Sequence, residues 1–170
     1  QSVGELRVYL QDELLADHVP PRQRDAFHQV IDDLLAAITP RFADTEAIRI
    51  HGDCHQANLL DRPDEGLMII DFDDMMVGPP VHDLWMLLPG HAREARRELD
   101  LMLDGYEEFR EFDWHTLRLI EPLRAMRIIY FLAWVGRQTD DPAFRLNFPD
   151  WGGDGFWSRQ IRDLAEQLRL

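Results

Sequence analysis

Two short segments carry side chains that could perform phosphoryl transfer. Residues 50–60 read IHGDCHQANLL, and residues 68–74 read MIIDFDD. An apolar segment leads into a loop with Asp53, Asn58 follows five residues later, and a second apolar segment ends on Asp71. Phosphoryl transfer needs one carboxylate beside the acceptor hydroxyl and separate hard oxygen ligands that hold Mg²⁺ against nucleotide phosphates. The two segments supply such groups in a suitable order.

The spacing within these segments is more informative than the residue types. His51 to Asn58 reproduces the H-x-D-x-x-x-x-N catalytic loop of protein kinases, and Asp71-Phe72 stands where the metal-binding Asp of D-F-G would stand. Taken singly, Asn58 fits a turn, and Asp53 and Asp71 fit carboxylates that cap nearby amides. Taken together and in this order, they favour a catalytic and metal-binding site.

Other polar side chains in the two segments have more than one interpretation. His51 precedes a glycine, and we expect it to hold the loop by hydrogen bonding. His55 either contacts a substrate phosphate or packs within the loop. Asp73 and Asp74 bring further negative charge close to Asp71, which is unfavourable unless a cation is near. One of them could reach a second metal ion, or both could lie on a solvated loop.

The first forty residues have the apolar spacing of two amphipathic helices. The first set is Val3, Leu6, Leu10 and Leu14, and the second is Phe27, Ile31, Leu34, Leu35 and Ile38. Pro20 and Pro21 predict a break followed by the first turn of the second helix. Thr39-Pro40 predicts its end, because the residue before a proline avoids the α region.

A small β region is expected next, followed by a long helical region. Short apolar runs at 47–50, 59–60 and 67–70, with turn residues at 62–66, predict a hairpin. Helical periodicity then predicts helices over 81–88, 92–112, 114 to about 137, and 156–170, and a packed loop over 139–155. A stripe of large side chains fits a buried core: Trp85, Met86, Trp114, Met126 and Trp134.

Composition excludes several classes of protein. The chain has 170 residues, all 18 basic residues are Arg, and the net charge is −14, which argues against binding to nucleic acid or anionic membranes. The absence of lysine excludes chemistry that needs its amine. The single Cys54 cannot form an internal disulfide, residues 1–10 (QSVGELRVYL) do not resemble a secretory signal, and no apolar run could span a membrane. A cytoplasmic location is expected.

These motifs resemble the aminoglycoside phosphotransferase and choline kinase superfamily, which has the bilobal protein-kinase fold. Within it, HGDCHQANLL, DFDDMMVGPPVHDLWMLLPG and LIEPLRAMRIIYFLAW to DPAFRLNFP are most similar to the bacterial stress-response serine/threonine kinase A group. The resemblance implies ATP as co-substrate, Mg²⁺ as cofactor and protein Ser/Thr as acceptor. Its implied residue roles are a catalytic base (Asp53), magnesium ligands (Asn58, Asp71), apolar contacts under the nucleotide (Leu60, Ile70) and support of the catalytic loop backbone (Asp83).

The chain departs from this family at its N-terminal side. Such kinases have a β-rich N-lobe with a glycine-rich loop and a strand lysine, and neither feature is present here. We therefore expect a mainly α fold: the helical C-terminal lobe of a kinase, with a small β-hairpin that carries the catalytic and metal-binding loops. It would comprise a helical pair (1–45), the hairpin (46–78) and a helical core (79–170), partnered by its own N-lobe and inactive without it.

Other functions remain open from the sequence. The Gly52-Asp53-Cys54-His55 element also matches a G-D-x-H element of metallophosphoesterases, although their further ligand motifs do not follow. A binding module without activity is another class of alternative. For a kinase, the acceptor could instead be a small alcohol such as an aminoglycoside, choline or homoserine, because a positioned base and Mg²⁺ serve any hydroxyl.

Overall fold

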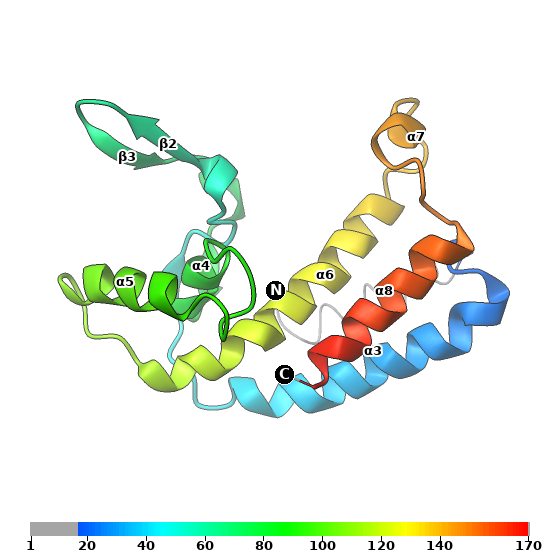
Figure 1. Cartoon of the computed structure of the whole chain (residues 1–170), viewed down its shortest axis with the longest axis horizontal. Coiled ribbons are helices and arrows are strands. Elements are labelled where there is room, and N and C mark those ends of the chain that lie inside the picture. Colours follow the sequence, from blue (N-terminus) through cyan, green and yellow to red (C-terminus); the bar gives the residue numbers. More distant parts are fainter. Residues whose placement is uncertain (1–16, 170) are drawn as a thin grey trace. The chain divides into compact units, whose positions relative to one another are not determined.

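The computed structural model describes residues 17–169 (Figure 1). They fall into two compact units. We call residues 17–41 with 124–169 the helical unit, and residues 42–123 the site unit. The helix expected over residues 3–14 lies outside the described residues. Within the described residues, no helix combines the length and apolar character needed to cross a membrane.

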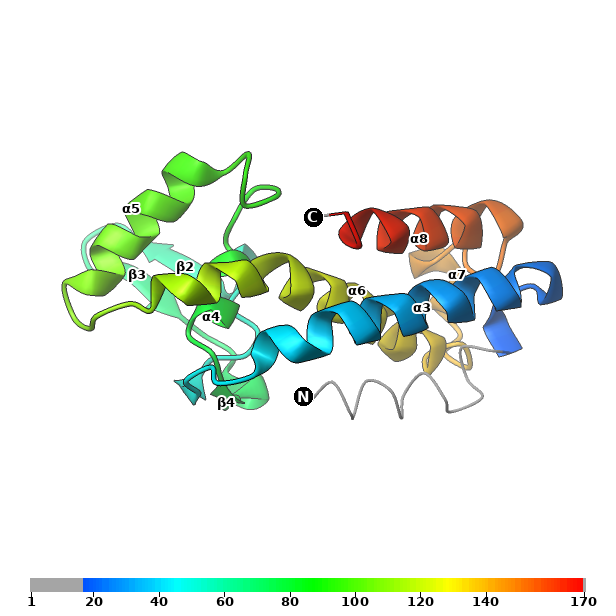
Figure 2. The ribbon, with the colours of Figure 1, turned by 90° about the horizontal axis from the view of Figure 1, so that it is seen from below.

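The helical unit is built around two helices that pack side by side, α3 (Arg24–Ile38) and α8 (Asp154–Gln167) (Figures 1 and 2). The apolar face of α3 is buried as its spacing predicts, and Phe27 meets Trp157 edge to face with 5.4 Å between ring centroids. At one end of the pair, Gln23 Nε2 donates to Ser158 Oγ at 2.7 Å. Burial of one apolar stripe on each helix therefore holds this unit together.

The connections of the helical unit differ in part from the expectation. The 3₁₀ turn η1 (Pro21–Gln23) follows Pro20, as the proline pair predicts. Helix α3 ends at Ile38, but Thr39 keeps α-region angles (φ −53°, ψ −47°) and starts the 3₁₀ turn η2 (Thr39–Phe42). The prediction that Thr39 leaves the α region was therefore wrong, although the helix ends where expected. Thr39 Oγ1 donates to the Leu35 carbonyl, and Pro40 enters a new first turn, where its missing N–H costs no bond.

The long segment after the central helix is partly ordered as a helix. Helix α6 (Ile120–Gly136) is followed by the expected packed loop, which also contains the short helix α7 (Phe144–Asn147). Phe144 and Trp151 of this segment are buried, and Trp151 contacts Trp157 with 5.4 Å between centroids. Aromatic packing therefore holds the segment to the helical unit.

The site unit contains two separate two-stranded antiparallel sheets. Strands β2 (Leu59–Arg62) and β3 (Gly66–Ile69) form the predicted hairpin, with Arg62 opposite Gly66, and Figure 1 shows it extending away from α4 and α5. Strand β1 (Ile48–Ile50) instead pairs with β4 (Met76–Gly78). Three residues give no recognisable alternation, so β4 had no signal in the sequence.

The helices of the site unit are shorter than their periodicity predicts. Helix α4 (Val81–Trp85) ends three residues early, and α5 (Arg96–Glu107) occupies the middle of the expected 92–112 segment. Residues 91 and 92 are instead held by Glu121, whose carboxylate accepts from His91 Nδ1 at 3.0 Å and from the Ala92 N–H at 3.1 Å. The segment from Trp114 begins as the 3₁₀ helix η5 (Trp114–Leu119) before α6.

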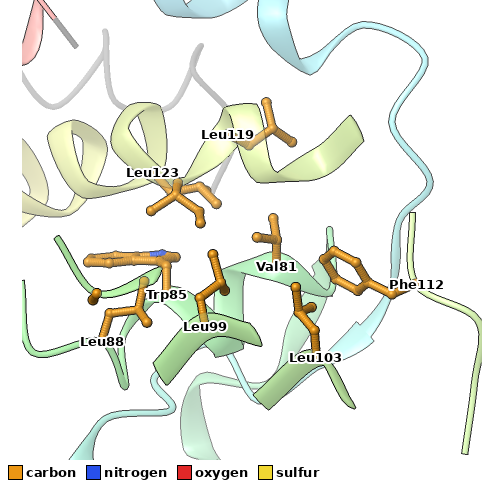
Figure 3. Packing of buried hydrophobic residues seen from close by; sticks show 10 residues of the cluster. Val81, Trp85, Leu88, Leu99, Leu103, Phe112, Leu119 and Leu123 are labelled. Atoms are coloured by element: carbon orange, nitrogen blue, oxygen red, sulfur yellow. The ribbon is translucent and has the colours of Figure 1, made fainter. Parts of the chain in front are cut away.

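One apolar cluster forms the core of the site unit (Figure 3). Its largest contributors come from α4 and the segment after it, α5 and the segment after it, η5 and the first turn of α6: Val81, Trp85, Leu88, Leu99, Leu103, Phe112, Leu119, Ile120 and Leu123. Phe112 lies five residues beyond the end of α5 (Glu107) and reaches the same core. Val81 and Trp85 thus anchor helix α4 in the core, while His82 and Asp83, which lie between them, remain available to contact a neighbouring loop.

The expected core stripe is correct only in part. Trp85 is buried and Met86 packs against the cluster, and Met126 is half-buried. Trp114 and Trp134 are 44% and 46% exposed, so their assignment to the core was wrong. The indole N–H of Trp114 donates to Glu107 Oε1 at 2.9 Å, and Trp134 stacks on the exposed Phe131. A polar N–H that finds a partner at the surface makes partial exposure acceptable for an indole.

Two leucines of α5 provide a test of this core. Leu103 is fully buried, whereas Leu101 on the same helix is 63% exposed. We expect Leu103→Ala to lower the free energy of unfolding by about 2–5 kcal/mol, because it removes buried methyl groups and leaves a cavity. Leu101→Ala should change it by less than about 0.5 kcal/mol. Urea unfolding followed by tryptophan fluorescence measures both, and equal losses in the two variants would contradict the packing described.

Candidate functional site

The loop after β1 folds around a glycine that no other residue can replace without strain. Gly52 has φ of +85°, and a Cβ placed on it would lie 2.3 Å from the Asp74 carbonyl oxygen. Positive φ is readily available only to glycine, and the contact leaves no room for a methyl group. The backbone of the loop therefore lies directly against the segment that follows Asp71.

A carboxylate from α4 holds the same loop by its backbone. Asp83 Oδ2 accepts from the His51 N–H at 2.7 Å, and Asp83 Oδ1 accepts from the Gly52 N–H at 2.9 Å. Hydrogen bonds from N–H groups to an ionised carboxylate are about twice as strong as neutral ones. Both oxygens of Asp83 are thus used to orient two successive peptide groups.

The His51 ring joins the two predicted functional segments. Its Nε2 lies 2.9 Å from the Ile70 carbonyl, and its Nδ1 accepts from the Asp53 N–H at 3.3 Å. A carbonyl can only accept, so Nε2 carries the proton and Nδ1 is left as the acceptor. The ring is buried and packs against the Phe72 ring, with 4.9 Å between the ring centroids. One neutral imidazole therefore spans from the backbone of Asp53 to the residue before Asp71.

Asn58 is buried at the end of the loop and makes a second link between the segments. Its side-chain Nδ2 donates to the backbone carbonyl of Asp53 at 3.0 Å, and its backbone carbonyl accepts from the Ile70 N–H at 3.0 Å. It belongs to the 3₁₀ turn η3 (Gln56–Asn58), which leads into β2. The backbone at Asp53, Asn58 and Ile70 is thereby brought together.

Asp71 has an unusual backbone conformation. It has φ of 65° and ψ of 68°, in the left-handed region, and it precedes the 3₁₀ turn η4 (Phe72–Asp74). Aspartate enters this region more readily than most residues, and such conformations concentrate at functional sites. The side chains of Asp71, Asp73 and Asp74 are exposed. Asp71 thus stands at a sharp turn immediately after the residue that contacts both His51 and Asn58.

Asp53 lies beside His55 in the same loop. Asp53 Oδ2 is 3.3 Å from His55 Nε2, and the two side chains are 16% and 37% exposed, respectively. Of the two apolar positions expected under a nucleotide, Leu60 on β2 is 44% exposed and Ile70 is half-buried. The Asp53 carboxylate is therefore partly accessible and lies next to the His55 imidazole, in the loop that leads through η3 into β2.

Cys54 is buried near the carboxylates of Asp53, in the same loop, and Asp83, on α4. Burial raises the pKa of its thiol, and the negative charges of Asp83 and Asp53 raise it further. The thiolate is the reactive form of cysteine, so this thiol is a packing group in the loop.

One hollow on the surface of the site unit lies away from these residues. It has a volume of about 640 Å³ and is lined by Glu46 and by residues 110–115. None of the residues predicted for catalysis or metal binding contributes to it. Among residues 17–169, no group of three or more His, Cys, Asp or Glu side chains is placed to hold a metal ion.

The structure also identifies a loop contact that the sequence analysis did not single out. His82 Nε2 lies 3.0 Å from the Gly52 carbonyl. His82 adjoins Asp83 in the chain, but its partner is 30 residues away, so only the fold reveals the contact.

Comparison with known proteins gives consistent matches. Residues 2–120 match the model of the phosphotransferase enzyme family. The chain is 46% identical over 153 residues to "Stress response kinase A" of Escherichia coli strain K12, and 44% identical to "Serine/threonine protein kinase RdoA" of Salmonella typhimurium. Each match covers 89% of this chain and 46% of the relative. The chain therefore spans about half the length of the curated relatives it matches.

A solved structure shares the fold. "Amicoumacin kinase hAmiN in complex with AMP-PNP, Ca2+ and Ami" superimposes with a TM-score of 0.64 at 17% identity, covering 94% of this chain and 49% of that protein. At this identity the likeness concerns the fold alone. It confirms the expected mainly helical, kinase-like fold, and the sequence matches confirm the resemblance inferred from the motifs.

Two glycines with similar backbone angles test the packing of the loop. Gly52 (φ +85°) meets the Asp74 carbonyl, whereas Gly66 (φ +83°) has no atom within 4 Å of an added Cβ. We expect Gly66→Ala to lower the free energy of unfolding by about 1–2 kcal/mol through backbone strain alone. Gly52→Ala should lower it further, because it adds a clash with backbone. Chemical denaturation of both variants measures the difference, and equal losses would refute the close approach.

The raised pKa of Cys54 has two measurable consequences. Alkylation by iodoacetamide at pH 8 should be at least about 10-fold slower in the folded chain than in urea, because the folded thiol is protonated and covered. Above about pH 8.5, the unfolded chain releases this proton while the folded chain retains it, so the free energy of unfolding should fall as pH rises.

Cys54→Ala provides the control for this pH dependence. The variant should lose the part of the alkaline slope that comes from the thiol and keep the rest. Equal alkylation rates in the folded and unfolded chain would contradict the environment described for Cys54.

Proposed function

Because the chain belongs to the phosphotransferase enzyme family, we propose that it is the catalytic C-terminal lobe of an ATP- and Mg²⁺-dependent kinase. The intact kinase transfers the γ-phosphoryl group to a hydroxyl, with Ser or Thr of a protein as the acceptor. One observation carries the proposal: hydrogen bonds through His51 and Asn58 connect the backbone of Asp53 to the backbone of Ile70. The His51 ring contacts the Ile70 carbonyl, the backbone carbonyl of Asn58 accepts from the Ile70 N–H, and Ile70 directly precedes Asp71. These bonds link the loop that carries Asp53 and Asn58 to the residue directly before Asp71, which supports a shared role for the three side chains.

Asp53 is the catalytic base in this proposal. Its carboxylate accepts the proton of the acceptor hydroxyl as that oxygen attacks the γ-phosphorus and the bond to the leaving ADP oxygen breaks. A positioned base contributes about 10²–10⁴-fold to the rate. The partial exposure of Asp53 supports this role, because an acceptor must reach the carboxylate.

Asn58 and Asp71 fit a magnesium site by the chemistry of their donors. Mg²⁺ binds hard oxygens, and it commonly takes one or two protein ligands while water and substrate phosphates complete its coordination. Asn58 Nδ2 donates to the Asp53 carbonyl, which leaves the amide oxygen as the group that can coordinate a cation. When bound, Mg²⁺ would neutralise charge on the nucleotide phosphates. The exposed Asp71 carboxylate supplies the second oxygen.

The nucleotide would contact the exposed hairpin and a second lobe. Leu60, on β2, and Ile70, directly after β3, would provide apolar surface for the base. The chain has no lysine, so the cation that anchors the phosphates in such kinases must come from outside these 170 residues. The coverage of only 46% of the relatives agrees with this requirement, and the N-lobe is the partner that we propose. Without it, the chain should be inactive.

A protein hydroxyl is the preferred acceptor on the basis of the relatives. The relative from Salmonella typhimurium, 44% identical to this chain, is named a serine/threonine protein kinase. Small-molecule kinases share the fold, so fold likeness does not discriminate between acceptors. The acceptor should be tested directly with the intact polypeptide, by comparing [γ-³²P]ATP transfer to a generic protein substrate and to a panel of amino alcohols. Labelling of the amino alcohols alone would overturn the protein acceptor.

Substitution of Asp53 tests the proposed reaction. In the intact polypeptide, Asp53→Asn should lower kcat for ATP-dependent transfer by about 10²–10⁴-fold, because the base is lost while the shape of the side chain is kept. Asp104→Asn, at an exposed position of α5, is the matched control and should retain full activity. The 170-residue chain alone is a further sample and should show no turnover. Activity that survives Asp53→Asn would rule out this residue as the base.

A further inference from the structure

Two imidazole rings contact the peptide group between Gly52 and Asp53, one at its carbonyl oxygen and one at its N–H. His82 Nε2 lies 3.0 Å from the Gly52 carbonyl oxygen, and the Asp53 N–H donates to His51 Nδ1 at 3.3 Å. We propose that His82 is a positioning residue for Asp53, which acts by holding this peptide group in one orientation. The inference rests on the proposed function, in which Asp53 is the base.

The geometry of a peptide explains why both contacts matter. The group is planar, and in the trans form its C=O and N–H point in opposite directions, so two rings on opposite sides hold it as a rigid plate. Rotation of this plate changes ψ of Gly52 and φ of Asp53, and therefore the direction of the Asp53 side chain. Glycine resists such rotation less than any other residue. The bond from His82 thus acts where the backbone is least restrained by itself.

The contact of His82 differs from that of its neighbour Asp83. Asp83 accepts from the N–H groups of His51 and Gly52, so it orients the two peptide groups before the one that His82 contacts. A carboxylate cannot donate to a carbonyl, whereas an imidazole with a proton on Nε2 can. Consecutive residues of α4 therefore bind consecutive peptide groups of the loop, each with the required chemistry.

The His82 ring is itself held by the core of the site unit. It meets Trp85 edge to face, with 6.4 Å between ring centroids and an interplanar angle of 89°. Trp85 is buried in the apolar cluster of Figure 3, one turn further along α4. A chain of contacts thus runs from the core through Trp85 and His82 to the peptide group before Asp53.

Paired substitutions of His82 in the intact polypeptide test the proposal. His82→Leu removes the donor and retains an apolar side chain, while His82→Gln retains an N–H donor. We expect His82→Leu to lower kcat by about 10–100-fold with KM for ATP changed by less than about twofold, because a misplaced base impairs the chemical step. His82→Gln should recover kcat to within about threefold of the parent, since the donor is restored. His115→Leu, on the exposed surface of η5, is the control and should leave kcat unchanged.

A second readout separates this inference from the proposed function. Amide hydrogen exchange at Asp53, measured by NMR on the same variants, should become at least about 10-fold faster in His82→Leu and remain near the parent rate in His82→Gln. If the parent transfers no phosphate, the proposed function fails, and the exchange data alone decide the role of His82. Unchanged exchange and kcat in His82→Leu would overturn the positioning role, as would equal damage from Leu and Gln.

Discussion

The arrangement of the site depends on the two hydrogen bonds that the Asp83 carboxylate accepts from the loop backbone. Its two oxygens accept from the N–H groups of His51 and Gly52, so one charged side chain fixes the loop that carries Asp53. These N–H groups lie in a tight turn after β1, where the backbone has no strand partner to satisfy them. Leaving such groups unpaired inside a protein costs about 1–3 kcal/mol each. The loop conformation and the position of α4 are therefore coupled.

This coupling connects the apolar core with the polar site. Helix α4 has only five residues, too few to be stable by itself, and Val81 and Trp85 bury it in the cluster of the site unit. His82 and Asp83 lie between these two anchors and contact the loop. Packing energy at one face of the helix thus determines where polar groups stand at the other. A partly exposed loop can in this way keep a defined geometry.

Much of this organisation could be predicted from the sequence. The order of Asp53, Asn58 and Asp71, the hairpin and the amphipathic α3 follow from local signals: motif spacing, turn residues between apolar runs, and helical period. Periodicity failed at the ends of α4 and α5, and it failed for Trp114 and Trp134, because a regular spacing does not reveal which face is covered. Strand β4 and the 3₁₀ segments were too short to leave any pattern.

By itself the sequence determined the chemistry that this chain can offer: a carboxylate, an amide and a second carboxylate in a kinase-like order, with no lysine among the 170 residues. Only the tertiary structure decided which groups meet around Asp53. The Asp74 carbonyl that requires Gly52, the Ile70 carbonyl that sets the His51 tautomer, and the α4 side chains that hold the loop are all distant in sequence. Their contacts arise from packing between segments, and such non-local contacts leave no periodic or local signal in the chain.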